Sequence, residues 1–294
     1  MSALSQKKSG DTSLFVGIGG HSYRIDRPWG DVPGDIPIGM FAAVACDSKD
    51  NVYVFQRFDP LADRGPHPAI LKFDAQGRYL GAWGVGLIKD AHHMYIDKQD
   101  RVFLVDRDAH QIIVCDPDGK VLFTIGERDK PGHPFGHPTS VAVAPSGDIY
   151  VSDGYGATNV HRFAADGTHI STWGALGSGA GEFTTPHGIA CLSDGTVLVG
   201  DRENDRVQAF DGTGRHLRDL RGFFHPMFVY VDATDTIFVS DQIPRLTAVK
   251  ADGTLVGMCR PVLNGGHAVF GDGAGNLYLA ESRPNRITRM TRND

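Results

Sequence analysis

The chain has 294 residues, a formal net charge of -6 and a pI near 6.1, and its lysines and arginines are scattered along the sequence. It therefore lacks the clustered basic surface that nucleic acids and anionic membranes require, and neither is expected as a partner. No stretch approaches the roughly 20 apolar residues of a membrane span, and the N-terminus has no apolar signal-peptide core. We expect a cytoplasmic protein.

The four cysteines fit a reducing compartment. They are spread over the chain, and Cys46, Cys115 and Cys191 each interrupt an apolar strand pattern. This spacing is typical of buried thiols, because a disulfide framework or a metal cluster brings cysteines together in recognisable sets. Cys259 stands equally alone in the sequence.

The N-terminal region contains a polar segment and then one predicted strand. Residues 1–14, which begin MSALSQKKSGDT, are expected to be mobile. The following stretch, HSYRIDRPWG, predicts a strand over Tyr23 to Gly30. Its final Trp-Gly pair recurs at Trp83-Gly84 and Trp173-Gly174, so this strand resembles the last strand of a repeated unit that lies later in the chain.

From residue 40 onward one motif recurs six times. Each copy is a short apolar run, a turn of Asp, Gly, Ser or Asn, and a second run with alternating β-branched residues, so each predicts a β-hairpin. Four copies end in Asp, and the first and last end in Gln56 and Glu281. In chain order the copies are MFAAVACDSKDNVYVFQ, AHHMYIDKQDRVFLVD, PTSVAVAPSGDIYVSD, PHGIACLSDGTVLVGD, PMFVYVDATDTIFVSD and GHAVFGDGAGNLYLAE.

Two more strands follow most hairpins. AILKF, QIIVC, NVHRF and RVQAF predict the third strand, and YLGAWG, VLFTIG, HISTWG and HLRDLRG predict the fourth. Units of four strands, spaced by about 40 to 50 residues, predict an all-β fold, the six-bladed β-propeller. The last unit has three strands, so the strand at Tyr23 to Gly30 is expected to complete it. Because each blade needs its neighbours to cover its faces, residues 15–294 are predicted to form one domain.

The position fourteen residues before the end of each hairpin carries the main functional signal. It holds His92, His187 and His267 in the second, fourth and sixth copies, and Ala42, Thr139 and Met227 in the others. The first strand of each blade lines the central channel, so the three imidazoles are expected around one axis. Three histidines with one position open are the ligand set of catalytic zinc, and iron or copper would accept them too. For any one histidine taken alone, a channel residue bonded to water or backbone is the alternative.

Other recurring or nearby polar residues are expected to be structural. His93 alternates to the opposite side of its strand from His92 and should face the sheet or a neighbouring blade. His137 and His225, each followed by proline, should pack in loops at the channel mouth, where contact with a ligand stays open. The acidic ends of the hairpins are expected to bond backbone groups that link the blades, and they are Asp106, Asp153, Asp201 and Asp241.

The residues just after the hairpins differ between blades and lie on the histidine face. They include Arg57, Tyr155 and Arg202. A phenol close to a metal ion and two guanidinium groups can be deprotonated near neutral pH, which makes Tyr155 a candidate general base. The two arginines suit a carboxylate, which a guanidinium can bind through two hydrogen bonds. The alternatives are salt bridges for the arginines, with Arg107 as an example, and turn packing for Tyr155.

At these residues the chain resembles the peptidyl-α-hydroxyglycine α-amidating lyases, a family of six-bladed propellers with NHL-type repeats. The likeness extends from about Val44 to the end of the chain. It is densest in VSDGYG (residues 151–156), PHGIA (186–190) and DRENDRVQAF (201–210).

The resemblance implies a metal-dependent carbon-nitrogen lyase that acts on a small carboxylate-bearing substrate. The substrate class is an N-acyl-α-hydroxyglycine or a related carbinolamide, which is cleaved to an amide and glyoxylate. The residues that match the zinc histidines, the catalytic tyrosine and the active-site arginines are His92, His187, His267, Tyr155, Arg57 and Arg202.

The chain also departs from the family. Ala268 replaces an acidic residue that helps to hold a structural calcium, and Gly265 replaces a nearby methionine, which argues against calcium and for a wider pocket wall. Gly156, Leu198 and Ala209 stand where secreted members carry disulfide cysteines, in agreement with a cytoplasmic location.

Two other functions stay open on the sequence. Another propeller metalloenzyme, such as a lactonase or hydrolase, could use the same histidines. A non-catalytic binding scaffold is also compatible with NHL-type repeats. The acyl group of the substrate, the biological role and the oligomeric state are not indicated by the sequence.

Overall fold

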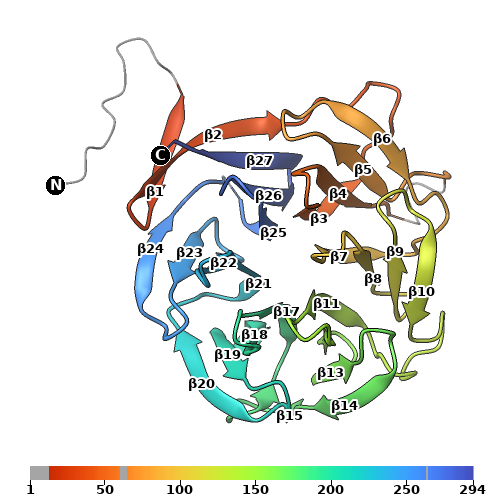
Figure 1. Cartoon of the computed structure of the whole chain (residues 1–294), viewed down its shortest axis with the longest axis vertical. Helices are drawn as coiled ribbons and strands as arrows, with labels where there is room; N and C mark the ends of the chain where they lie inside the picture. The colour runs from red at the N-terminus through yellow and green to blue at the C-terminus, as the bar shows by residue number, and fades with distance from the viewer. Residues whose placement is uncertain (1–12, 60–64, 263, 294) are drawn as a thin grey trace.

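The computed structural model describes residues 13–59, 65–262 and 264–293. Within them, six sheets of four or five strands stand in a ring, which confirms the predicted six-bladed β-propeller (Figure 1). The predicted mobile segment, residues 1–14, falls almost entirely on residues 1–12, which lie outside the described residues. No helix in the described part of the chain is long and apolar enough to cross a membrane.

The strands of each blade run in order from the axis to the rim (Figure 1). The innermost strands are β3 (Met40–Cys46), β7 (Ala91–Ile96), β11 (Pro138–Val143), β17 (Pro186–Cys191), β21 (Pro226–Val231) and β25 (Gly266–Gly271). The second strands are β4 (Val52–Arg57), β8 (Val102–Asp106), β12 (Ile149–Asp153), β18 (Val197–Asp201), β22 (Ile237–Asp241) and β26 (Leu277–Ser282). The third strands are β5 (Ile70–Phe73), β9 (Gln111–Cys115), β13 (Asn159–Phe163), β19 (Arg206–Phe210), β23 (Leu246–Val249) and β27 (Asn285–Arg292). The outer strands are β6 (Tyr79–Trp83), β10 (Val121–Ile125), β14 (His169–Trp173), β20 (His216–Arg221), β24 (Leu255–Cys259) and β2 (His21–Trp29).

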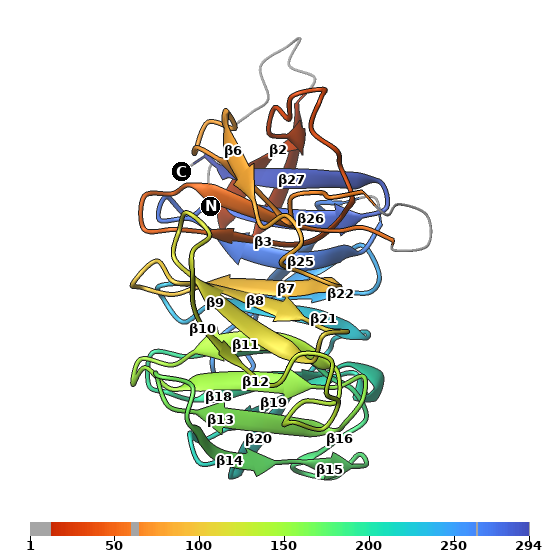
Figure 2. The same ribbon diagram turned by 90° about the vertical axis from the view of Figure 1, so that its right-hand side faces the viewer.

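Viewed from the side, the strands run between the two faces of the ring (Figure 2). Each first strand starts at the face that carries the histidines, and the hairpin turn after it reaches the opposite face. A short parallel pair, β15 (Ala175–Leu176) and β16 (Glu182–Phe183), lies in the link between blades three and four. A 3-10 turn, η1 (Arg202–Asn204), follows β18.

The N-terminal strand closes the ring, as predicted. β2 pairs antiparallel with β27, with Trp29 opposite Ile287, and so supplies the outer strand of blade six. The sequence did not predict β1 (Leu14–Ile18), which pairs with β2 and contacts β24 of blade five. The first and last strands of the described residues therefore share one sheet.

Tryptophans at the ends of the outer strands pack against the next blade. An added Cβ on Gly119 would lie 2.6 Å from the Trp83 ring, and one on Gly214 would lie equally close to Trp173. Both glycines also have positive φ, 88° and 92°, which L side chains rarely adopt. The Trp-Gly pairs seen in the sequence thus mark inter-blade contacts.

The acidic residues that end the hairpins hold the loop that leads into their own blade, as predicted. Asp106 accepts hydrogen bonds from the backbone N–H groups of Lys89 and Asp90, each at 2.9 Å. Asp201 and Asp241 accept bonds from the corresponding loops of their blades. Because these loops join consecutive blades, the buried carboxylates fix the start of each inner strand.

On the face opposite the histidines, aspartates in the left-handed conformation connect neighbouring hairpin turns. Asp100, at φ 59°, accepts bonds from the backbone N–H and the hydroxyl of Ser48 in blade one, both at 2.7 Å. Asp235, at φ 60°, accepts a bond from the N–H of Ser193 in blade four at 2.9 Å. These contacts tie blade two to blade one and blade five to blade four.

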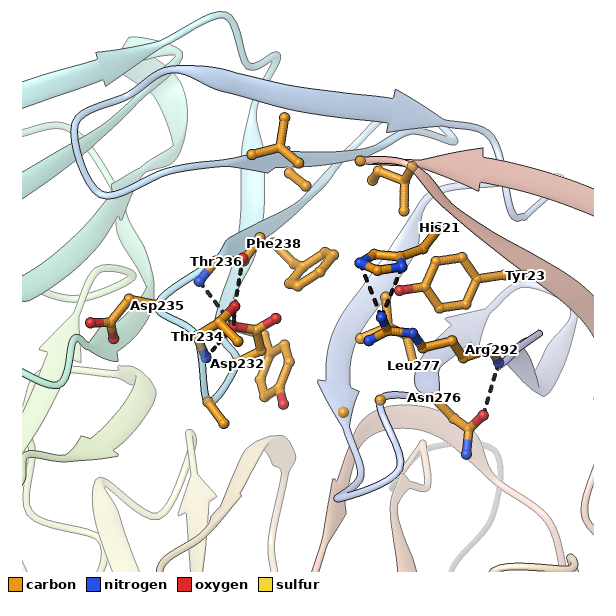
Figure 3. Close-up of a pocket in the computed structure, with 18 of the residues that line it drawn as sticks. His21, Tyr23, Asp232, Thr234, Asp235, Thr236, Phe238, Asn276, Leu277 and Arg292 are labelled. Atoms are coloured by element: carbon orange, nitrogen blue, oxygen red, sulfur yellow. Dashed lines mark hydrogen bonds between the residues drawn. The ribbon is translucent and has the colours of Figure 1, made fainter. Parts of the chain in front are cut away.

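A groove of about 860 Å³ opens on that face between blades five and six, where the corresponding turn residue is Gly275 (Figure 3). His21 and Arg292 lie on one side of it, and Arg292 Nη2 is 2.8 Å from His21 Nδ1. On the other side, Asp232 accepts bonds from the N–H groups of Thr234 and Thr236 in its own turn. His21, Arg292 and Asp232 thus bond to one another or to their own backbone.

Candidate active site

The three predicted histidines meet at the ring axis. His92 lies on β7, His187 on β17 and His267 on β25, and one nitrogen of each lies within 4.8 Å of the others. Within the described residues, this is the one group of three or more potential ligands that converges in this way. His92 and His187 are 1% and 0% exposed, so this cluster is buried at the floor of the channel mouth.

Each histidine occupies a β-bulge. The pairing between first and second strands is interrupted at His92, at His187 and at His267, where the register shifts past the residue. The same shift occurs at the equivalent position of the other three blades. A bulged residue leaves the ladder, so its side chain turns toward the axis and its carbonyl becomes available to the neighbouring blade.

These bulges explain why the histidines alternate with other residues. Each imidazole Nδ1 lies 2.6 Å from the backbone carbonyl at the equivalent position of the next blade. The pairs are His92 with Thr139, His187 with Met227, and His267 with Ala42. Even blades supply the imidazole and odd blades supply the carbonyl that orients it, so the side chain at the odd position is not constrained to be a ligand.

The hydrogen bonds and the burial suit a metal ion. A carbonyl oxygen can only accept, so each Nδ1 carries the proton and each Nε2 presents its lone pair. Burial is the main cause that lowers the pKa of all three imidazoles, and the pKa of His267 falls to about 4. The neighbouring imidazoles and the charges of Arg57 and Arg202 lower these pKa values further. Neutral imidazoles with this tautomer are the form that binds a metal.

The floor beneath the histidines is apolar. The ring of Phe228 on β21 lies 4.9 Å from the His187 ring and 5.1 Å from the His267 ring. On its other side Phe228 stacks on His93 at 4.7 Å, and His93 Nδ1 faces the Ser140 hydroxyl at 3.0 Å. Ala268 is also buried here. Phe228 and Ala268 thus give this floor its apolar character.

Tyr155 reaches the histidines from the loop after β12. Its hydroxyl lies 2.9 Å from His187 Nε2 and accepts a hydrogen bond of 2.9 Å from Arg202 Nη1. The Arg202 guanidinium also lies over the Tyr155 ring, 5.2 Å from its centre. The structure therefore brings Tyr155 and Arg202 together beside the histidine cluster, as the sequence predicts.

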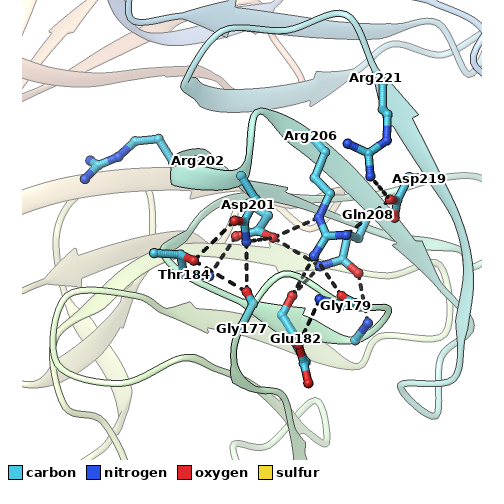
Figure 4. Close-up of polar contacts among 12 residues, drawn as sticks. Gly177, Gly179, Glu182, Thr184, Asp201, Arg202, Arg206, Gln208, Asp219 and Arg221 are labelled. Carbon is cyan, nitrogen blue, oxygen red and sulfur yellow. Dashed lines mark hydrogen bonds and ion pairs between the residues drawn. The ribbon is translucent and has the colours of Figure 1, made fainter.

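A buried polar network holds the turn that carries Arg202 (Figure 4). Arg206, 2% exposed, donates from Nε to Asp201 at 2.9 Å and from Nη2 to the carbonyls of Gly179 and Glu182. The backbone N–H of Arg202 itself donates to Thr185 in the loop before β17 at 3.0 Å. The link between blades three and four is thus bonded to the start of η1, and the Arg202 side chain points away from this network toward the channel.

Arg57 approaches the histidines from the end of β4. Its Nε lies 2.5 Å from Asp90 Oδ1 and 2.8 Å from the carbonyl of Ala91. Its Nη2 is buried and has no hydrogen-bond partner. Because a buried guanidinium N–H without a partner is unfavourable, this atom is prepared for an acceptor from a ligand.

The sequence interpretation assigned Arg107 to a salt bridge and passed over Asp90. Arg107 does form ion pairs, with Asp90 Oδ2 and with Asp108 Oδ1. However, its guanidinium also lies 5.6 Å from the centre of the Tyr155 ring, so it belongs to the mouth. Burial raises the pKa of Asp90 to about 6 despite the two arginines beside it. The available signal was an acidic residue two positions before His92, one of the three alternating histidines.

The loop histidines lie at the mouth without joining the cluster. His137 Nδ1 is 3.4 Å from Asp108, and its ring is 4.6 Å from that of His110. His225 Nδ1 is 3.1 Å from the carbonyl of Arg202. Both pack in the loops as expected, and neither bonds to the three central imidazoles in the described structure.

The chain is similar to known proteins both in its repeats and over most of its length. The NHL repeat model matches residues 135–164 and 183–210, in blades three and four. The chain is 30% identical over 268 residues to peptidyl-alpha-hydroxyglycine alpha-amidating lyase 1 of Drosophila melanogaster, a match that covers 81% of this chain and 46% of that protein. The chain is a homologue of the amidating lyases. Its identity to peptidylglycine alpha-amidating monooxygenase of Rattus norvegicus is 28% over 296 residues, which cover 86% of this chain and 30% of the rat protein.

This amidating-lyase homologue spans less than half the length of these two relatives. Among solved structures, a gluconolactonase from Xanthomonas campestris superposes with a TM-score of 0.68 at 14% identity, covering 97% of this chain and 96% of that one. At that identity the similarity shows the propeller fold alone.

Proposed function

We propose that this chain is a metal-dependent lyase that cleaves the carbon-nitrogen bond of an N-acyl-α-hydroxyglycine or a related carbinolamide. The products are an amide and glyoxylate. The names of the relatives support the reaction class. The observation that carries the proposal is the convergence of three correctly oriented imidazoles with Tyr155 and a buried, unpartnered Arg57 Nη2.

His92, His187 and His267 would hold the metal ion through Nε2. Zinc is the ion that this ligand set favours, and iron or copper would accept it. When bound, such an ion supplies Lewis acidity beside Tyr155, which makes a hydroxyl group at the site more acidic. The apolar floor formed by Phe228 keeps the imidazoles neutral by excluding water beneath them.

The protein groups then account for binding and proton transfer. Arg57 Nη2 and Arg202 hold the substrate carboxylate, so that the hydroxyl group lies at the Tyr155 oxygen. Tyr155, whose oxygen accepts a hydrogen bond from Arg202, acts as the general base for the hydroxyl proton. The carbonyl of glyoxylate forms as the carbon-nitrogen bond breaks, and the bonding pair goes to the amide nitrogen. That nitrogen receives the proton from Tyr155, so the hydroxyl proton ends on the amide.

The direct test is incubation of the purified, metal-loaded protein with α-hydroxyhippurate. Benzamide and glyoxylate should appear in equal amounts. A parallel assay with simple lactones distinguishes a lactonase, and a protein that binds one metal ion per chain but cleaves neither substrate would contradict the enzyme assignment. A non-catalytic scaffold has no reason to hold that ion tightly.

A further inference from the structure

Asp90 links two arginines at the channel mouth. One carboxylate oxygen lies 2.5 Å from Arg57 Nε, and the other forms an ion pair with Arg107 Nη2. The Asp90 side chain is 11% exposed, and the Arg57 and Arg107 side chains are 19% and 28% exposed. Bringing two cations this close in a half-buried site is unfavourable unless an anion lies between them, and Asp90 occupies that place.

The two arginines reach different parts of the site. Arg57 also donates from Nε to the carbonyl of Ala91, next to His92, and leaves Nη2 buried with no partner. Arg107 lies over the Tyr155 ring at 5.6 Å, and Arg202 lies over the same ring at 5.2 Å. Asp90 therefore connects the group that faces the ligand with a group that packs on the tyrosine.

We propose that Asp90 and Arg107 act as one positioning unit, which aims Arg57 Nη2 at the substrate carboxylate and holds the Tyr155 ring. Neither residue contacts the reacting atoms. Because the ligand is taken to be a carboxylate, this role rests on the function proposed above. Arg107 is also held by the neighbouring Asp108, whose Oδ1 lies 2.8 Å from Arg107 Nε, so a second carboxylate fixes the unit.

The alternative role for Asp90 is charge neutralisation alone. The two roles predict opposite changes in carboxylate affinity when the Asp90 charge is removed. If Asp90 only neutralised charge, removing that charge would leave the arginines more positive and strengthen the binding of any carboxylate. If Asp90 positions Arg57, removing the charge frees two like-charged groups to separate, and carboxylate binding weakens. The sign of the change in affinity therefore decides between the roles.

The experiment measures the binding of hippurate, which carries the carboxylate but has no hydroxyl group and cannot be cleaved. Calorimetry is carried out on the metal-loaded wild type, on Asp90→Asn, on Arg107→Met and on the double variant. Each single variant should weaken hippurate binding about tenfold, the lower end of the cost of removing an outer-shell partner. The double variant should weaken it no further, because the two residues act together. Benzamide, which lacks the carboxylate, should compete equally well in all four proteins.

The matched control is Asp97→Asn, which removes a comparable ion pair in the same blade, on the opposite face. Asp97 Oδ2 lies 2.7 Å from Arg101 Nε. This variant should bind hippurate as the wild type does, and melting curves report the folding of every variant. Three results would overturn the positioning role. The first is Asp90→Asn that binds hippurate as tightly as the wild type or more tightly, and the second is additive effects in the double variant. The third is a wild type that binds no hippurate. A wild type that binds hippurate but releases no benzamide from α-hydroxyhippurate would refute the lyase function and leave the positioning role standing.

Discussion

The channel mouth and the groove between blades five and six are lined by the same kinds of side chain, but they use them differently. In the groove, both ring nitrogens of His21 lie within 3.1 Å of Arg292 Nη2, and Asp232 caps its own turn. In the mouth, three imidazoles orient their Nε2 atoms toward one point, and Arg57 Nη2 is buried without a partner.

The difference shows that the size of a hollow is a poor guide to function here. The groove is large, but His21, Arg292 and Asp232 within it bond to neighbouring protein groups. In the mouth, Arg57 Nη2 is buried without a hydrogen-bond partner, and an unpaired donor in a buried place indicates a ligand. The following changes test this contrast, from the largest expected effect to the smallest.

Replacing one of the three histidines should abolish the metal site. His187→Ala removes one of three ligands, so bound metal should be lost and the release of benzamide should fall about a thousandfold or more. Metal analysis and a turnover assay measure both. His21→Ala in the groove is the control and should keep the metal. Full activity of His187→Ala after thorough metal removal would refute the metal mechanism.

Tyr155→Phe should lower kcat by about 10² to 10⁴, the usual contribution of a general acid-base group. The KM for α-hydroxyhippurate should change little, because the ring and its packing between Arg107 and Arg202 remain. Steady-state kinetics separates the two parameters. A kcat within tenfold of the wild type would show that another group takes the proton.

Arg57→Lys should raise the KM about tenfold while changing kcat less. A lysine ammonium cannot bond to Asp90 and Ala91 and also present a second nitrogen to the ligand, as the guanidinium does. The comparison substrate is N-(hydroxymethyl)benzamide, which has no carboxylate and should be processed equally by both proteins. An equal loss on the two substrates would argue against carboxylate binding by Arg57.

The metal-free protein should lose stability as the pH falls below about 6.5. The three central imidazoles have lowered pKa values in the folded state, whereas in the unfolded chain they return to about 6.5. Groups of this kind stabilise the fold above their unfolded pKa, and that stability is lost as the unfolded chain takes up protons. Melting curves should show a drop of several degrees between about pH 7.5 and pH 5, and a smaller drop in His187→Ala. A profile that is identical in the two proteins would contradict the buried, neutral state.

Asp235→Gly should have the smallest effect on catalysis. It removes the contact with Ser193 on the opposite face but keeps a residue that tolerates the φ of 60°. The melting temperature should fall by a few degrees, since one inter-blade contact of about 1 kcal/mol is lost. The kinetic constants should stay within twofold of the wild type, and a larger change would show that the two faces are coupled.

The sequence predicted the ring and its closure by the N-terminal strand, because the strand motif repeats at fixed spacing. The alternation of His92, His187 and His267 along the repeat predicted that these imidazoles meet at the axis. The sequence could not reveal that the residues at the equivalent position of the odd blades orient the histidines through their backbone carbonyls. Ala42, Thr139 and Met227 share no side-chain chemistry, and a backbone contact leaves no mark in the identity of the residue.

Asp90, and the contact of Arg107 with Tyr155, were missed for a related reason. Their importance comes from contacts across three blades, with Arg57 on one side and Tyr155 on the other. Within the repeat, an aspartate before the first strand and an arginine after the second are ordinary surface residues. β1 was missed because LFVGI is short and lies beside a polar segment.

A crystal structure of the protein with zinc and hippurate tests the central claim most directly. We predict one ion bound by Nε2 of His92, His187 and His267, with the hippurate carboxylate on Arg57 Nη2 at the channel mouth. An ion bound elsewhere, or hippurate in the groove between blades five and six with an empty mouth, would contradict the account.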